Sequence, residues 1–251
     1  SFNTTIVKNF ANMFSYCAML ESLDLSSFDT TEVEDMSGMF SNCGKLTSIK
    51  FGIFNTKYVK NMEGMFLSCN AITSLELSDF NTENVQNMKR MFFSCSKLIS
   101  LDLSKFRTSK VENMEEMFYS CKELKTINLK QFDVSKVTNM DGMFYSNSEL
   151  TSLDLSSFIP SQTRNMYSMF GFFGYTSMTT LDLGNNFDTS NVTNMSGMFY
   201  DCGYTSMTTL NLGDNFDTSN VTDMSGMFYG CGRTSMTSLD LGEYFNTSNV
   251  T

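Results

Sequence analysis

A single thiol recurs at one fixed place along this 251-residue chain. The seven cysteines are Cys17, Cys43, Cys69, Cys95, Cys121, Cys202 and Cys231. Copies of a stacked unit lie about 4.8 Å apart, whereas the Cβ atoms of a disulfide lie about 3.8 Å apart. A metal site needs several converging ligands, which a column with one cysteine per unit does not supply. The spacing therefore predicts a buried ladder of free thiols, with no metal and no cofactor.

Hydroxyl and acidic side chains form two more columns, two residues apart. The hydroxyl column is Ser22, Ser48, Ser74, Ser100, Thr126, Ser152, Thr180, Thr209 and Ser238. The second, mostly acidic column is Asp24, Lys50, Glu76, Asp102, Asn128, Asp154, Asp182, Asn211 and Asp240. Repeat proteins use such extended faces for binding, so these residues are the predicted ligand-binding site. The alternative is a solvated face whose hydroxyls and charges only keep the array soluble.

Catalytic chemistry finds little support in the residue types. The chain has no histidine, which excludes a serine or cysteine nucleophile with a histidine base. The glycine-rich motifs of phosphate- and dinucleotide-binding loops are missing as well. We therefore expect that the protein is not an enzyme.

The elements that position these columns belong to a repeat marked by Met-Phe. The pair begins at Met13, Met39, Met65, Met91, Met117, Met143, Met169, Met198 and Met227. The spacing is 26 residues six times and then 29 residues twice. A fixed period of this size indicates a solenoid, propeller or array, in which each unit buries its apolar side against its neighbours.

Each unit contains two shorter periods. Met36, Met39, Phe40 and Cys43 fall at i, i+3, i+4 and i+7, which predicts a short helix over 36–43 and its equivalents, with a 3₁₀ turn as the alternative. An Asn or Asp precedes the first Met position in every unit and is expected to cap that helix. The alternation of leucine with polar residues over 22–26 predicts a short, half-buried strand.

The predicted fold class is therefore an α/β repeat solenoid of the leucine-rich-repeat type. It has one short parallel strand and one short helix or 3₁₀ turn per unit. Residues 1–251 form a single solenoid with nine full units: six of 26 residues over 2–157 and three of 29 residues over 158–244. A partial unit follows over 245–251. The extra residues of the longer units fall outside the core positions, which marks them as loop insertions.

Composition limits the partners. The net charge is −10 and the isoelectric point is about 4.5, so no basic surface is available to follow a phosphate backbone, and nucleic acid is not an expected partner. No apolar run is long enough for a transmembrane segment.

A second candidate surface follows the Met-Phe pair directly. It consists of Leu67, Phe93, Tyr119, Tyr145, Tyr200 and Tyr229. If exposed, these side chains form an apolar and aromatic contact edge. Alternatively, they pack against the neighbouring turn.

Two segments carry a family resemblance: F-D-T-S-N-V-T-N-M-S-G-M-F-Y-D-C, from Phe187 to Cys202, and L-T-S-L-D-L-S-S-F, from Leu150 to Phe158. They resemble the BspA-like leucine-rich repeat proteins, in the Met-Phe-rich branch common in mycoplasma and Gram-positive bacteria. The resemblance covers the entire chain. It implies an extracellular, surface-displayed solenoid associated with adhesion, and it brings no catalytic residues.

Together these features lead us to expect a non-enzymatic cell-surface protein. We expect it to bind a host or cell-surface protein or glycan through the outward strand face. The alternative is a structural repeat protein that self-associates into a surface coat or filament.

Overall fold

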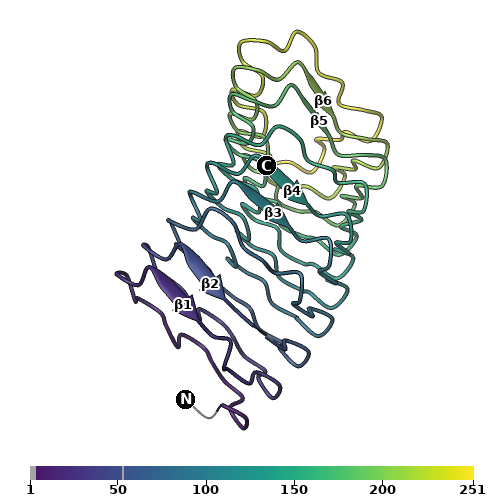
Figure 1. Cartoon of the computed structure of the whole chain (residues 1–251). Coiled ribbons are helices and arrows are strands. Elements are labelled where there is room, and N and C mark those ends of the chain that lie inside the picture. Colours follow the sequence, from purple (N-terminus) through teal and green to yellow (C-terminus); the bar gives the residue numbers. More distant parts are fainter. Residues whose placement is uncertain (1–3, 53) are drawn as a thin grey trace.

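The chain winds into a repeat solenoid of stacked coils (Figure 1). The computed structural model describes residues 4–52 and 54–251. Residues 2 and 3 of the first predicted unit and residue 53 of the second lie outside this described part. The units stack along one axis, from the N-terminal coils in purple to the C-terminal coils in yellow (Figure 1).

Within the described residues, six short parallel strands lie on one side of the coils. They are β1 (Ser22–Asp24), β2 (Ser48–Lys50), β3 (Ser100–Asp102), β4 (Thr126–Asn128), β5 (Thr180–Asp182) and β6 (Thr209–Asn211). They pair as β1–β2, β3–β4 and β5–β6, each in parallel register. The central leucine or isoleucine of each strand points inward and its two neighbours are exposed, which confirms the predicted half-buried strand in six units. The units that contain Ser74, Ser152 and Ser238 have no strand at the equivalent place, so the prediction of one strand per unit is wrong there.

A second ladder joins every described unit to the next. The Asn or Asp before the first Met position forms a parallel bridge to its equivalent, from Asn9↔Asp35 through to Asn194↔Asp223. The side-chain oxygen of this residue accepts the N–H two residues later, at 2.7–3.3 Å. The predicted capping bond is therefore present, but it begins a turn and not a helix.

The predicted helix or 3₁₀ turn is wrong: among residues 4–52 and 54–251 no segment is helical. In its place, alternate residues bond to the next unit; the N–H of Gly38 donates to the Glu63 carbonyl at 2.7 Å, and that of Phe40 to Met65 at 2.9 Å. The residues between them close tight turns, as Met39 does on Met36. These successive turns stand where the helix was predicted, so the described units have no α-helical part.

A left-handed residue in each turn explains why a helix cannot form. Gly38 has φ +59° and Asn42 has φ +59°, four residues apart, and this spacing recurs along the chain. A positive φ at the third residue of a turn closed by an i to i+3 bond is the geometry of a type II β-turn, and it breaks a right-handed helix. Two such turns in succession place Met36, Met39, Phe40 and Cys43 inside, which reproduces a helical spacing without a helix.

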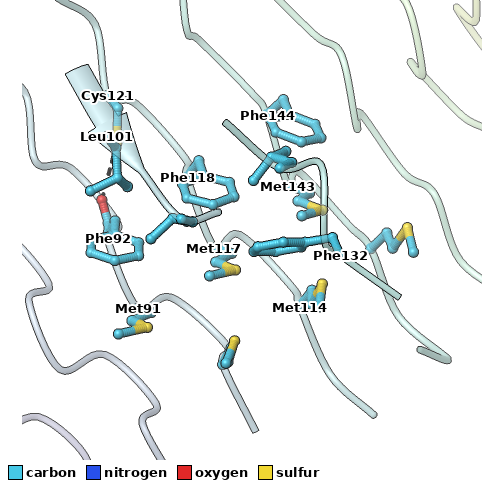
Figure 2. Packing of buried hydrophobic residues seen from close by; sticks show 14 of the residues in the cluster. Met91, Phe92, Leu101, Met114, Met117, Phe118, Cys121, Phe132, Met143 and Phe144 are labelled. Carbon is cyan, nitrogen blue, oxygen red and sulfur yellow. Dashed lines mark hydrogen bonds between the residues drawn. The ribbon is translucent and has the colours of Figure 1, made fainter. Parts of the chain in front are cut away.

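The core consists of side-chain ladders that run along the axis. The phenylalanines of the Met-Phe pairs stack ring on ring, with centroids 5.5–5.9 Å apart and planes within 16° of parallel. Figure 2 shows Phe92, Phe118 and Phe144 in this row, with Met91, Met117 and Met143 beside them. The methionine and valine positions of the inner units are also buried, as are the leucine positions before and after the strand centre, whereas central residues such as Leu75 and Leu153 are half-buried. Each unit thus covers its apolar side with its neighbours.

Candidate functional site

The strand face carries both predicted columns on its outer side. Every residue of the hydroxyl column and of the mostly acidic column is exposed. Where strands pair, equivalent residues stand opposite one another, as in Ser22↔Ser48, Asp102↔Asn128 and Thr180↔Thr209. The described structure therefore brings the predicted residues together as two parallel rows.

The acidic column has a structural task that the sequence did not reveal. Its Asp or Asn oxygen accepts the backbone N–H two residues later, at 2.9–3.2 Å, in seven units. This bond ends the strand with an Asx turn. Asn128 and Asn211 make it as well as the aspartates do, so the turn explains the choice of Asp or Asn but does not require a charge.

The same bonds stabilise the charged form of the carboxylates. The Ser26 hydroxyl and N–H, helped by Lys50, lower the pKa of Asp24 to about 2. The backbone N–H and hydroxyl of Ser104 lower the pKa of Asp102. Hydrogen bonds to an ionised carboxylate favour that form. Asp24 and Asp102 are therefore charged at neutral pH, and the charge of Asp24 is paired with Lys50 at 3.0 Å.

A small depression lies on the strand face between β2 and β3, which do not pair with each other. β2 and β3 belong to different sheets, and the unit between them, with Ser74 and Glu76, has no strand. A depression of about 180 Å³ lies there, lined among others by Ser74, Glu76, Ser100 and Asp102. Four predicted site residues thus line this depression.

The predicted contact edge is a ladder of half-buried rings. Phe93, Tyr119 and Tyr145 stack at 4.8 Å and 4.5 Å, and Tyr200 stacks on Tyr229 at 4.8 Å. Most of these side chains are half-buried, and Tyr229 is exposed. Sequence reasoning missed Phe172, which occupies the edge in the seventh unit. The faces of the stacked rings contact one another, so the ladder mostly presents ring edges and phenol groups.

The cysteine ladder is free and mostly buried, as predicted. Cys43, Cys69, Cys95, Cys121 and Cys202 are buried, whereas Cys17 is exposed and Cys231 is half-buried. The inner thiols donate to the phenylalanine carbonyl 29 residues earlier, at 3.1 Å. Burial raises the pKa of the Cys121 thiol to about 12, so the inner thiols are poor nucleophiles.

A buried threonine column also escaped sequence reasoning. It comprises Thr30, Thr56, Thr82, Thr108, Thr189 and Thr218. Each hydroxyl donates to a carbonyl of the next unit at 2.8–3.0 Å. The recurring Phe-x-Thr pattern was the available signal. The column ties neighbouring units together and offers no group to a ligand.

Two further features of the described residues concern metals and membranes. In the part of the chain that the structure describes, no three Cys, Asp or Glu side chains gather as a metal site would need. Within those same residues there is no helix with the length and apolarity to cross a membrane.

The parallel ladders, the Leu-x-Leu strand and the stacked core define a leucine-rich-repeat-type repeat protein. The chain belongs to the family described as "Mycoplasma protein of unknown function, DUF285", whose model matches residues 1–69, 44–128, 93–202 and 171–251. A solved leucine-rich repeat protein from Bacteroides ovatus ATCC 8483 shares 16% identity, over 90% of this chain and 81% of that one, with a TM-score of 0.24. None of the curated proteins compared with this chain matches it.

Proposed function

We propose that this chain is a non-enzymatic, extracellular surface protein that binds a host or cell-surface protein or glycan on its strand face. The observation that supports the proposal is the pair of exposed hydroxyl and acidic rows, held in register by parallel pairing. The BspA-like resemblance of the repeat supplies the surface location and the adhesive role. The depression beside Ser74 and Asp102 is the proposed centre of contact.

The acidic row lends itself to a test that leaves the turns in place. The set Asp102→Asn, Asp154→Asn and Asp182→Asn removes three charges from the face. Asparagine already makes the same turn bond at Asn128 and Asn211. We expect binding of the chain to immobilised basement-membrane extract and to intact epithelial cells to fall about tenfold, because several charged contacts are lost together.

A matched control set is available elsewhere in the chain. Asp133, Asp188 and Asp217 also cap turns through their side chains, but outside the strand face. Asp133→Asn, Asp188→Asn and Asp217→Asn together change the net charge equally and keep those turns. The control set should bind as the unaltered chain does. Equal binding by both sets and the parent chain, at equal thermal stability, would sink the proposal.

A further inference from the structure

The aromatic edge is regular except at one place. Phe93–Tyr119, Tyr119–Tyr145 and Tyr200–Tyr229 stack with their planes within 16° of parallel. Phe172 lies between Tyr145 and Tyr200 and is turned by 67° from the first and 44° from the second, with centroids 5.5 Å away in both cases. Phe172 instead lies nearly parallel to Tyr175, with 19° between the planes and centroids 6.4 Å apart. The faces of Tyr145 and Tyr200 that point toward Phe172 are therefore not covered by a parallel ring.

The break has a cause in the sequence. The residue after Met169-Phe170 is Gly171, where five other units have an aromatic ring. A Cβ atom at Gly171 would lie 2.8 Å from the Tyr145 ring. Any larger residue at position 171 would therefore clash with the Tyr145 ring where it now lies. The next residue, Phe172, supplies the ring from a left-handed position, with φ +52°. The edge is therefore displaced by one residue in this unit.

A groove of about 430 Å³ opens at the break. Its aromatic lining is Tyr145, Tyr167, Phe172 and Tyr200, and the rest is serine and glycine from three successive units. The Ser196 and Ser225 hydroxyls lie 2.7 Å apart, and Tyr167 is 51% exposed. All of the lining residues are uncharged, on a chain whose net charge is −10.

The residues that line the groove favour one chemical class of ligand. An ion would find no partner of opposite charge among the lining side chains, and a wholly apolar ligand would cover the serine and phenol hydroxyls without hydrogen bonds. A sugar ring combines a face of C–H groups, which packs on an aromatic face, with hydroxyls that exchange hydrogen bonds. The volume is within the range of small-molecule sites. We propose that this groove binds a neutral saccharide, at a place separate from the strand face.

Binding can be measured on the intact chain by saturation-transfer NMR. The probes are maltose, cellobiose, lactose and N,N′-diacetylchitobiose, each titrated into the millimolar range. At least one of them should bind, and Tyr167→Ala should weaken its affinity about fivefold, the scale of one aromatic contact. Failure of all four to bind, or equal affinity in Tyr167→Ala, would overturn the proposal.

Control variants guard against a general effect on the fold. Tyr58 is 45% exposed and lines another depression with Glu34 and Lys60, so Tyr58→Ala should leave saccharide affinity unchanged. Ser225→Ala keeps every ring and removes one hydroxyl, and it should also weaken binding. The acidic sugar 3′-sialyllactose should bind less tightly than lactose, since the lining has no cation. Tighter binding of the acidic sugar contradicts a neutral-saccharide site.

Discussion

Asn147 is the residue that fits this molecule least well. It replaces cysteine in the inner column and is fully buried, and among the described residues neither its Oδ1 nor its Nδ2 has a hydrogen-bond partner. A buried polar group without a partner costs about 1–3 kcal/mol. The cysteines of the other inner units avoid this cost because they donate to a phenylalanine carbonyl.

The variant Asn147→Cys should therefore raise the free energy of unfolding by about 1–3 kcal/mol. Urea denaturation followed by circular dichroism measures the change. The reverse substitution, Cys121→Asn, places an amide in an equivalent buried position and should destabilise the protein. An unchanged or lower midpoint for Asn147→Cys would show that the Asn147 amide is satisfied in solution.

Asp141 should make stability depend on pH. Burial, followed by the nearby Glu115 and Glu116, raises its pKa to about 6, although the Tyr167 N–H and Lys89 act in the opposite direction. Because the folded state holds this proton more tightly than the unfolded state, the contribution of Asp141 to stability falls as pH rises from about 4 to about 6. Asp141→Asn removes this dependence.

Thermal unfolding at pH 4 and pH 7 tests the direction. The stability of Asp141→Asn relative to the parent chain should increase between these two values. Asp102→Asn is the control of opposite sign, because the pKa of Asp102 is lowered and its carboxylate stabilises the fold above its unfolded pKa. A difference between Asp141→Asn and the parent that does not vary with pH would contradict the assignment.

At the scale of the element, the tight turns are the feature that sequence reasoning misjudged. The inward positions were predicted correctly, because the Met, Phe and Cys columns are buried in the inner units. Their spacing predicts a helix, but two consecutive four-residue turns direct the same side chains into the core. Gly38 and its equivalents supply the positive φ that these turns need.

The strands of six units agree with the prediction for a physical reason. In a half-buried strand, successive side chains point alternately to the core and to solvent, so apolar and polar residues alternate. Few other structures produce this two-residue period. The turn role of Asp102 and the stacking of Tyr119 on Tyr145 depend on contacts within or between turns that no residue spacing encodes. The sequence therefore predicts which residues lie on the candidate site, but it does not predict the shape of the surface that they form.

Two glycines that follow strands β5 and β6 allow the cost of backbone strain to be distinguished from the cost of a clash between neighbouring units. Gly184 and Gly213 occupy equivalent positions with φ +75° and +78°. A Cβ at Gly213 would lie 2.2 Å from the Gly184 carbonyl oxygen, whereas one at Gly184 would meet nothing within 4 Å. Both alanine variants carry the same left-handed strain, but only Gly213→Ala pushes two units apart.

Gly213→Ala should therefore reduce the free energy of unfolding by about 1–3 kcal/mol more than Gly184→Ala does. Guanidinium denaturation of the two variants side by side measures this difference. Equal losses would mean that the units can separate slightly at no cost, and that the close approach is not a constraint on the array.

At the scale of the whole molecule, the repeat of the Met-Phe pair correctly predicts a solenoid. The three extra residues of the longer units do not disturb the stacking of the coils. The Asn bridges continue from Asn165 to Asn194 and Asp223, where the spacing changes from 26 to 29 residues. The phenylalanine ladder also continues across this change, through Phe170 and Phe199. A repeat protein tolerates longer loops in this way because each unit contacts only its neighbours. The described units therefore behave as a linear series.

The direction of the hydrogen bonds between units determines how the molecule responds to force. The N–H groups of Gly38 and Phe40 point along the axis to the next unit. Tension applied to the two ends along that axis passes through every boundary in series, so the weakest boundary opens first and the units separate one after another. Each 26-residue unit that peels away lengthens the chain by up to about 90 Å. A protein of this design extends in small steps under load, and so absorbs mechanical work without failing all at once.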